Sequence, residues 1–512
     1  MKKTILLVLI LNFLSVPQSL PEPTNKAGNI DALITANYEE GLFNGAVLVA
    51  HKGEVVYRKA FGLSNREWNV ETTVDTKFRI GSLSKPFTAL LIMQLVEDGH
   101  LSLEGTLADY LPDYHGKGKE LITIHQLLSH TSGVLGSLPP EKEAVQERLS
   151  HDLEDLARYA EAADLYFTPG TGFRYSNLGY SILALIAEKV TNTPFHLLLK
   201  KRIFDKAGMK DSKQDMDQLV EHRLATGYEY DLLNGYENTT FLDNSYAQGA
   251  GGVTTTINDL YAWHLSLLSG NLLPLHKQEK MYTPYGGGSY GYGWGIRKKA
   301  CVNGDTVRIL EHTGSVNGFG SYLARIPEDS TLVVVLKNSR SHNYLRPVFS
   351  AGLGAMIISI LYDEPVTIPK KSIAMHLARV IGSHGMDSAV GEFLRLKRQK
   401  SPEYSFEESE LNKLGIELLM QYGMVNAAAR IFELNMHEFP NSYNVYDSYA
   451  YALRQQGEFA ESIKYYAKGL EVLKRYPEQN SGPSVQQDAL NAVKSISEME
   501  ERLRHTDSPP SE

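Results

Sequence analysis

The strongest constraint on the fold is the position of the strand-like segments along the chain. The segment GAVLVAHKGEVVYRKAFG at 45–62 predicts two strands joined by a His-Lys-Gly turn. Far along the chain, TLVVVLKNS at 331–339 predicts another buried strand. Helix and loop patterns fill the sequence between them. We therefore expect an α/β (α+β) fold whose sheet takes strands from both ends of this region and is flanked by helices.

Two apolar segments within this region predict buried helices. TALLIMQLVEDG begins at Thr88 and ends at Gly99, where glycine is a common helix terminator. LGYSILALIAEKVTN at 178–192 has the same apolar character. Both segments begin just after groups of polar residues, which draws attention to the residues at their N-terminal ends.

The pattern changes after about Pro369, where strand signals vanish and helical signals take over. Within 411–477, three positions recur at a spacing of 34 residues. The pairs are Leu419 with Leu453, Gly423 with Gly457, and Phe432 with Tyr466. A period of 34 residues is that of the tetratricopeptide repeat, a helix-turn-helix unit, and this part of the chain resembles it. The alternative is two unrelated amphipathic helix pairs.

We expect the helical part to cover 370–505, with 386–396 as a degenerate first unit and 504–512 as a disordered tail. Two repeats are few for an independent solenoid, so docking onto the preceding domain is a further expectation. Repeats of this type usually offer a concave surface to peptides, which suggests a protein partner.

Bulk composition excludes several classes of protein. A chain of 512 residues is too long for one ordinary core and predicts two or more domains. Its 42% hydrophobic and 22% charged residues are typical of a soluble globular protein. The net charge of −9 leaves no basic footprint, so we expect no nucleic-acid partner.

The first residues resemble a secretory signal. Lys2 and Lys3 precede a short apolar run at 4–16, which a proline-containing stretch then breaks. We expect a signal peptide at 1–19, an exported protein that is periplasmic or secreted, and no membrane span after cleavage. An uncleaved anchor is the alternative. The single cysteine, Cys301, excludes an intramolecular disulfide, and we expect it to be buried and inert.

Ser82 and Lys85 stand three residues apart at the start of the first apolar helix. At this spacing both side chains lie on one helix face. A serine hydroxyl needs an adjacent base, or a cation that favours its alkoxide, to act as a nucleophile, and a desolvated lysine can fill either role. The alternative is that Ser82 caps the helix and Lys85 is solvated.

Tyr175 and Asn177 lie just before the second buried helix, where a phenol and an amide can both face a pocket. The same Y-x-N pattern recurs at Tyr236 and Asn238, but no buried helix follows that copy closely. We therefore favour the first copy. The alternative for Tyr175 is a structural aromatic that caps the helix.

His312, Thr313 and Gly314 lie between two strand-like runs. We expect Gly314 to let a substrate backbone approach the strand closely. The alternative for His312 is an edge histidine with a purely structural role. His125 and His130, which flank the QLLS stretch, are expected to be packing residues and not metal ligands.

In the order S-x-x-K, Y-x-N, H-T-G, the chain resembles the serine β-lactamase and penicillin-binding-protein superfamily, specifically its class C-like branch. The resemblance covers about 30–365 and extends to other stretches. These are TIHQLLSHTSGV, GAGGVTTTINDLYAW and GYGWGI. It implies a β-lactamase-like antiparallel sheet flanked by helices plus an all-helical domain, over 28–368, followed by the helical repeat domain.

By this resemblance, Ser82 would be the acylated nucleophile and Lys85 would take its proton. Tyr175 would relay a proton to the leaving group. Asn177 would hold an amide of the substrate. The resemblance assigns these roles, and the spacing of the residues does not establish them.

In the third motif, His312 stands where the β-lactamases of the branch usually carry lysine. Thr313 would bind a substrate carboxylate, with Gly314 beside it. The backbone N–H groups of Ser82 and Ser315 would form the oxyanion hole. Because a neutral imidazole attracts a carboxylate less than an ammonium does, the histidine favours peptidase or esterase activity over β-lactamase activity.

The sequence thus predicts an exported serine hydrolase that acts on an amide or ester, similar to a D-alanyl-D-alanine carboxypeptidase or an esterase. The alternatives are a β-lactamase, or a penicillin-binding sensor of peptidoglycan that signals through its repeats. The expected substrate is a small molecule or peptide, and no cofactor or metal motif is present. Loops at 138–166 and 231–246 are expected to shape the pocket.

Overall fold

The central sheet combines strands from both ends of the first region, as the sequence predicts. The computed structural model describes residues 25–506 except 216–219, 302–303, 305, 341–349, 369 and 482–484. The expected signal peptide therefore lies outside the described residues. The sheet is antiparallel, in the order β10-β11-β12-β13-β1-β2. Its strands are β1 (Gly45–His51), β2 (Glu54–Phe61), β10 (Gly295–Ala300), β11 (Thr306–Val316), β12 (Phe319–Ile326) and β13 (Thr331–Lys337).

The first hairpin forms at the predicted turn. Lys52 and Gly53 join β1 to β2 with φ angles of 52° and 85°. Two successive left-handed residues match the right-handed twist of the flanking strands. All of β1 is buried, because both of its neighbours, β2 and β13, belong to the sheet and helices cover both faces.

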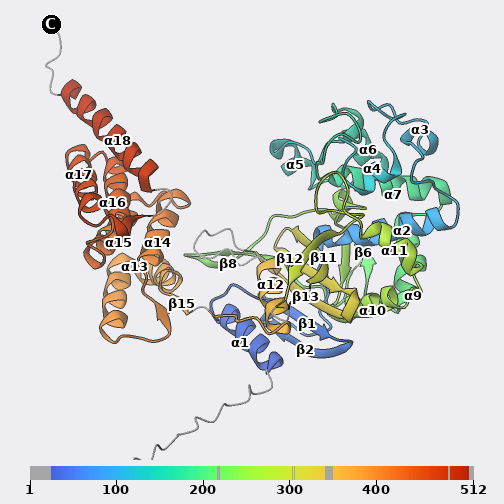
Figure 1. Ribbon diagram of the computed structural model, residues 1–512, viewed down its shortest axis with the longest axis horizontal. Coiled ribbons are helices and arrows are strands. Elements are labelled where there is room, and N and C mark those ends of the chain that lie inside the picture. Colours follow the sequence, from blue (N-terminus) through green and yellow to red (C-terminus); the bar gives the residue numbers. More distant parts are fainter. Residues whose placement is uncertain are drawn as a thin grey trace, which may run out of the picture.

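Helices cover the two faces of the sheet with separate apolar cores. On one face, α1 (Lys26–Glu39) and α12 (Ser350–Leu361) pack against residues that include Val47 and Val333 (Figure 1). On the other face, α2 (Lys85–Glu97) and α10 (Ile257–Leu268) join a core that includes Leu48. Neighbouring residues of a strand point to opposite faces, so Val47 and Leu48 serve different cores.

A group of helices between β2 and β10 forms the second part of this region (Figure 1). Ser176 caps α7, since its Oγ accepts a hydrogen bond from the N–H of Gly179 at 2.8 Å. Asn192 ends α7 in the left-handed conformation. The helices are α3 (Leu107–Tyr110), α4 (Ile124–Leu128), α5 (Pro140–Gln146), α6 (Leu153–Glu161), α7 (Asn177–Thr191), α8 (Phe195–Leu199), α9 (Asp205–Ala207) and α11 (Leu275–Met281).

Short strands tie the loops of this region together. One small sheet has the order β5-β9-β6 and a second has the order β14-β7-β8, while β3 pairs with β4. These strands are β3 (Leu63–Asn65), β4 (Val70–Glu71), β5 (Phe78–Arg79), β6 (Lys213–Gln214), β7 (Tyr228–Asp231), β8 (Gly235–Asn238), β9 (Val253–Thr255) and β14 (Ser339–Arg340).

The C-terminal region is helical, as predicted. Gly423 and Gly457 have φ angles of 61° and 83° and lie in the turns within two successive helix pairs. Gly385 breaks α13 with a φ of 81°, so 386–396 lies on the helix that follows the break. The helices are α13 (Ile373–Arg398), α14 (Glu408–Met420), α15 (Val425–Glu438), α16 (Tyr443–Gln456), α17 (Phe459–Arg475) and α18 (Val485–Thr506).

Two details differ from the sequence prediction. Strand pairing does not vanish after Pro369, because β15 (Lys371–Ser372) pairs in parallel with β16 (Tyr404–Ser405). A strand of two residues has no periodicity from which it could be predicted. In addition, the expected disordered tail begins too early, since α18 continues to Thr506.

The hairpin of β7 and β8 projects from the sheet region into the helical C-terminal region (Figure 1). Leu232, at its tip, is 1% exposed within a core formed mainly by α13 to α15. The hydroxyl of Tyr422 donates to Asp231 Oδ2 at 2.8 Å and accepts from the N–H of Leu232 at 3.1 Å. A Cβ on Gly382 would lie 2.0 Å from the carbonyl oxygen of Leu233, so only glycine fits there. The helical region is therefore packed against the hairpin.

Among the helices of the described residues, none combines the length and the apolar character needed to cross a bilayer.

The contacts at the hairpin tip predict the effect of Tyr422→Phe. The change removes a hydrogen bond to a half-buried carboxylate and one to a backbone N–H, which should cost about 1–2 kcal/mol. We expect faster hydrogen exchange at 228–238, measured by mass spectrometry. Tyr451→Phe, on an exposed position of α16, is the control and should leave exchange unchanged. Unchanged exchange in Tyr422→Phe would show that these bonds do not hold the hairpin.

Candidate active site

Ser82 and Lys85 lie in contact at the junction of two helices. Ser82 belongs to a 3₁₀ turn, Gly81–Ser84, that runs directly into α2. Lys85 is the first residue of α2 and is 0% exposed. Its Nζ lies 3.1 Å from Ser82 Oγ. The alternative prediction, in which Lys85 is solvated, is thus wrong.

The hydrogen bonds of Lys85 define how its amine is oriented. Nζ donates to Asn177 Oδ1 at 2.8 Å and to the carbonyl oxygen of Ala250 at 2.9 Å. These two oxygens can only accept, whereas the hydroxyl of Ser82 can also donate. Burial lowers the pKa of Lys85 well below its ordinary value. If Lys85 loses its proton, an amine held in this way would direct its lone pair at the hydroxyl of Ser82.

The turn that carries Ser82 is fixed by its neighbours. The hydroxyl of Ser84 donates to the carbonyl oxygen of Gly81 at 2.8 Å and accepts from the N–H of Val253 at 3.0 Å. The N–H of Ile80 donates to the carbonyl oxygen of Val253 at 3.0 Å. These bonds attach the turn to β9 and leave the hydroxyl of Ser82 available to Lys85.

The H-T-G motif lies within β11 and not between two strands as predicted. A Cβ on Gly314 would lie 1.8 Å from the carbonyl oxygen of Ile80. The close neighbour that requires glycine is therefore the backbone of the chain itself, which corrects the expectation that Gly314 makes room for a substrate. A Cβ on Gly81 would lie 2.8 Å from the nitrogen of Ser315. The backbones that carry Ser82 and Ser315 thus meet at this edge of β11.

Tyr175 lies against both Ser82 and Lys85. Its ring centroid is 4.6 Å from Lys85 Nζ. Burial raises the pKa of Tyr175 above its ordinary value, and a hydrogen bond with Ser82 offsets this only in part. At neutral pH the side chain is therefore a phenol that can donate a proton and is not a phenolate.

His130 supports the loop that carries Tyr175. Its Nδ1 accepts from the N–H of Ser176 at 3.1 Å, and its carbonyl oxygen accepts from the N–H of Arg174 at 2.9 Å. The rings of His130 and Tyr175 lie 4.3 Å apart. His130 is 0% exposed, which agrees with a packing role.

The structure places His312 beside this cluster as a neutral imidazole. Its Nδ1 lies 2.6 Å from the carbonyl oxygen of Thr313, which can only accept, so Nδ1 carries the proton. Nε2 is left to accept from the hydroxyl of Tyr290 at 2.8 Å. Burial is the main cause that lowers the pKa of His312 to about 3. The position therefore offers no positive charge at neutral pH.

Sequence reasoning missed two residues that shape the site. Tyr290 holds His312, and Ser137 accepts from Asn177 Nδ2 at 3.1 Å, which turns Asn177 Oδ1 toward Lys85. Tyr290 directly precedes the GYGWGI stretch, and this position is the sequence signal that could have indicated its place at the site.

The second Y-x-N copy lies elsewhere. Tyr236 is in β8, where its ring covers the guanidinium of Arg66 at 3.2 Å and contacts the ring of Tyr230 at 4.9 Å. Its hydroxyl donates to the carbonyl oxygen of Gly41. These contacts belong to the hairpin near the helical region and not to the surroundings of Ser82.

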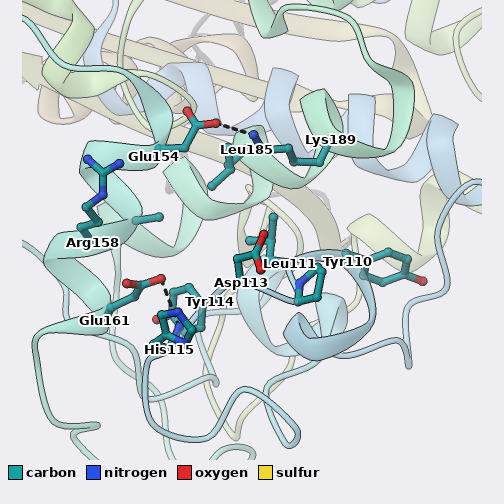
Figure 2. Close-up of a pocket in the computed structure, with 12 residues that line it drawn as sticks. Tyr110, Leu111, Asp113, Tyr114, His115, Glu154, Arg158, Glu161, Leu185 and Lys189 are labelled. Carbon is teal, nitrogen blue, oxygen red and sulfur yellow. Dashed lines mark hydrogen bonds and ion pairs between the residues drawn. The ribbon is translucent and has the colours of Figure 1, made fainter.

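One pocket adjoins the cluster, and a second does not. The first, of about 380 Å³, is lined by Tyr175 and Asn177 among others. Figure 2 shows the second, of about 520 Å³, between α3, α6 and α7. There Glu154 already pairs with Lys189, and none of the predicted site residues lines it. We therefore place the candidate site at the cluster around Ser82, where the first pocket meets it through Tyr175 and Asn177.

Within the described part of the chain, no group of three or more His, Cys, Asp or Glu side chains is arranged to hold a metal ion.

Known proteins with similar sequences include penicillin-binding proteins and an esterase. The chain is 28% identical over 369 residues to penicillin-binding protein 4* of Bacillus subtilis (strain 168), which covers 68% of this chain and 78% of that protein. It is 28% identical over 335 residues to esterase EstB of Burkholderia gladioli, which covers 58% of this chain and 85% of that protein.

Solved structures agree with these sequence relationships. A penicillin-binding protein from Bacillus halodurans superposes with a TM-score of 0.55 at 26% identity, over 64% of this chain and 98% of that one. A D-amino acid amidase from Ochrobactrum anthropi SV3 superposes with a TM-score of 0.56 at 20% identity, over 66% of this chain and 98% of that one. At this identity the likeness shows the fold alone.

The family model described as Beta-lactamase matches residues 30–347, which include all three motifs. This match covers more than half of the chain and includes the sheet, most of its flanking helices and the cluster around Ser82. The protein therefore belongs to the β-lactamase family, whose fold is shared by penicillin-binding proteins and serine hydrolases.

Proposed function

We propose that this protein is an exported serine hydrolase that cleaves an amide or ester through an acyl-enzyme on Ser82. The observation that carries the proposal is the buried Lys85, whose amine is held by two carbonyl oxygens and faces the hydroxyl of Ser82. Export rests on the basic and apolar residues of the predicted signal peptide at 1–19.

In acylation, Lys85 removes the proton of Ser82 while Oγ attacks the carbonyl carbon of the substrate. The bonds to Asn177 and Ala250 hold the amine in place and also stabilise the ammonium that forms. The backbone N–H groups of Ser82 and Ser315 receive the oxyanion. Each such donor is worth about 3–4 kcal/mol of barrier.

The leaving group then needs a proton. Tyr175 is a phenol in hydrogen-bond contact with Ser82. It can donate its proton to the departing amine or alcohol and receive one from the ammonium of Lys85. Asn177 holds an amide of the substrate, and Thr313, next to Gly314, donates a hydrogen bond to a substrate carboxylate. Water then hydrolyses the ester on Ser82 and regenerates the enzyme.

The neutral His312 bears on which substrates the site can bind. Lysine at this position would attract a carboxylate, whereas an imidazole held by Tyr290 and Thr313 does not. An ester needs no cation at this position, so the neutral imidazole supports an esterase. A peptidase of the D-alanyl-D-alanine carboxypeptidase type would bind the carboxylate of its substrate through Thr313. We propose these two activities ahead of a β-lactamase. The similarity to proteins named as a penicillin-binding protein and an esterase supports this order.

We also propose that 370–505 is a tetratricopeptide-like domain that binds a protein partner. Glycines with positive φ in the turns of both helix pairs, Gly423 and Gly457, support this assignment.

The first prediction of the proposed function concerns Ser82→Ala. The mature protein should gain the mass of a fluorescent penicillin, measured by intact-mass spectrometry, and Ser82→Ala should gain none. Turnover of ester or D-amino-acid amide substrates should fall by at least about a thousandfold, because the residual rate comes from binding alone. Circular dichroism should show an unchanged fold.

The lifetime of the adduct separates the alternatives. An adduct that lasts for hours without ester or amide turnover would favour a penicillin-binding sensor, and rapid release of hydrolysed drug would favour a β-lactamase. Turnover that persists in a clean Ser82→Ala preparation would remove the proposed nucleophile.

The second prediction concerns pH. Lys85 must be neutral to accept a proton, so kcat/KM should rise with pH as Lys85 loses its proton and then level off. Because burial lowers the pKa of Lys85, the plateau should begin well below the ordinary value of 10.5. His312, with a pKa of about 3, should add no titration near neutral pH. A rise in kcat/KM centred at or above 10.5 would contradict Lys85 as the base.

A further inference from the structure

The positive charges around the candidate site are distributed unexpectedly. Lys85 is buried and committed to Ser82, Asn177 and Ala250. His312 is neutral. The pocket of about 380 Å³ beside Tyr175 and Asn177 has a single cationic lining residue among those described, which is Arg174. Any substrate anion that this pocket receives must therefore meet Arg174.

The guanidinium of Arg174 is held in place but has no acidic partner among the residues that the structure describes. It lies over the ring of Tyr166, 3.6 Å from the centroid. The ion pairs among the described residues do not include Arg174, whereas the exposed Arg158 of α6 pairs with Asp155. Stacking restrains the plane of the guanidinium and leaves its N–H edge available.

The rest of the pocket fits a short polar extension of a substrate. Ser137 accepts from Asn177 Nδ2 at 3.1 Å, so its hydroxyl lies directly beyond the amide that contacts Lys85. Leu138, Pro139 and Pro140 supply an apolar wall. No carboxylate is among the described residues that line this pocket.

We propose that this pocket is a subsite for a carboxylate carried by the acyl part of the substrate, and that Arg174 selects it. The inference rests on the proposed hydrolase function, in which Asn177 holds the amide of that acyl part. A carboxylate attached to the acyl part beyond the substrate's amide would lie past Ser137. There it would pair with the N–H edge of Arg174 through two hydrogen bonds. The substrate class is then an ester or amide with an anionic acyl group.

The test compares two esters that differ by one carboxylate. N-succinyl-D-alanine methyl ester carries it beyond the amide, and N-acetyl-D-alanine methyl ester does not. Binding is measured by calorimetry on full-length Ser82→Ala protein, which cannot turn the esters over. We expect the succinyl ester to bind about fivefold more tightly, since Arg174 is exposed to solvent. The difference should shrink in about 1 M salt.

The second arm changes Arg174 in the same background. Arg174→Gln should abolish the preference, and Arg174→Lys should keep part of it because the charge remains while the planar fork is lost. Arg158→Gln, which removes an arginine of the same helical part outside this pocket, should leave the preference intact. Equal binding of the two esters, no binding of the succinyl ester, or a preference that survives Arg174→Gln would overturn the inference.

Failure of the inference is distinguishable from failure of the proposed function. Turnover of the acetyl ester by the unmodified protein, and its loss in Ser82→Ala, test the hydrolase alone. The binding preference is read in protein that performs no chemistry, so either result can fail while the other holds.

Discussion

The burial of Lys85 is the constraint on which the rest of this site depends. Burial without a carboxylate partner destabilises an ammonium, so it lowers the pKa of Lys85 and favours the neutral, hydrogen-bonded amine. Its partners come from three separate segments: Ser82 in the 3₁₀ turn before α2, Asn177 at the start of α7, and Ala250 before β9. The fold must bring all three together, and the chemistry follows from that convergence.

The main features of the fold could be predicted because their signals are long and periodic. The strands at 45–62 and 331–339 pair in one sheet, and the helical pattern after Pro369 gives successive helix pairs. The two-residue strand at Lys371–Ser372 has no such signal. The continuation of α18 to Thr506 was missed because a proline-containing polar tail follows it directly.

The site was predictable in part. The spacing of Ser82 and Lys85 placed both on one face of a helix start, and the structure brings them into contact. The reason for Gly314 was not predictable, since its neighbour Ile80 is distant in sequence and only the packed sheet brings them together. Tyr290 was missed for the same reason, because no local pattern indicates that its hydroxyl bonds with His312.

One hairpin links the site to the helical region. Its tip is held by Tyr422, while Glu229 of β7 accepts from the N–H of Gly318 at 3.3 Å. Gly318 lies in the turn that follows β11, the strand that carries His312 to Ser315. The helical region thus rests on an element that also contacts the end of the strand at the site.

The most direct test of this account is the protonation state of Lys85. In protein labelled with ¹³C at lysine Cε, the resonance of Lys85 can be identified by its absence from Lys85→Arg and followed through a pH titration by NMR. The account predicts a pKa well below the ordinary 10.5. A titration at or above that value would show that Lys85 is a cation at neutral pH, and it would contradict the assignment of Lys85 as the base that activates Ser82.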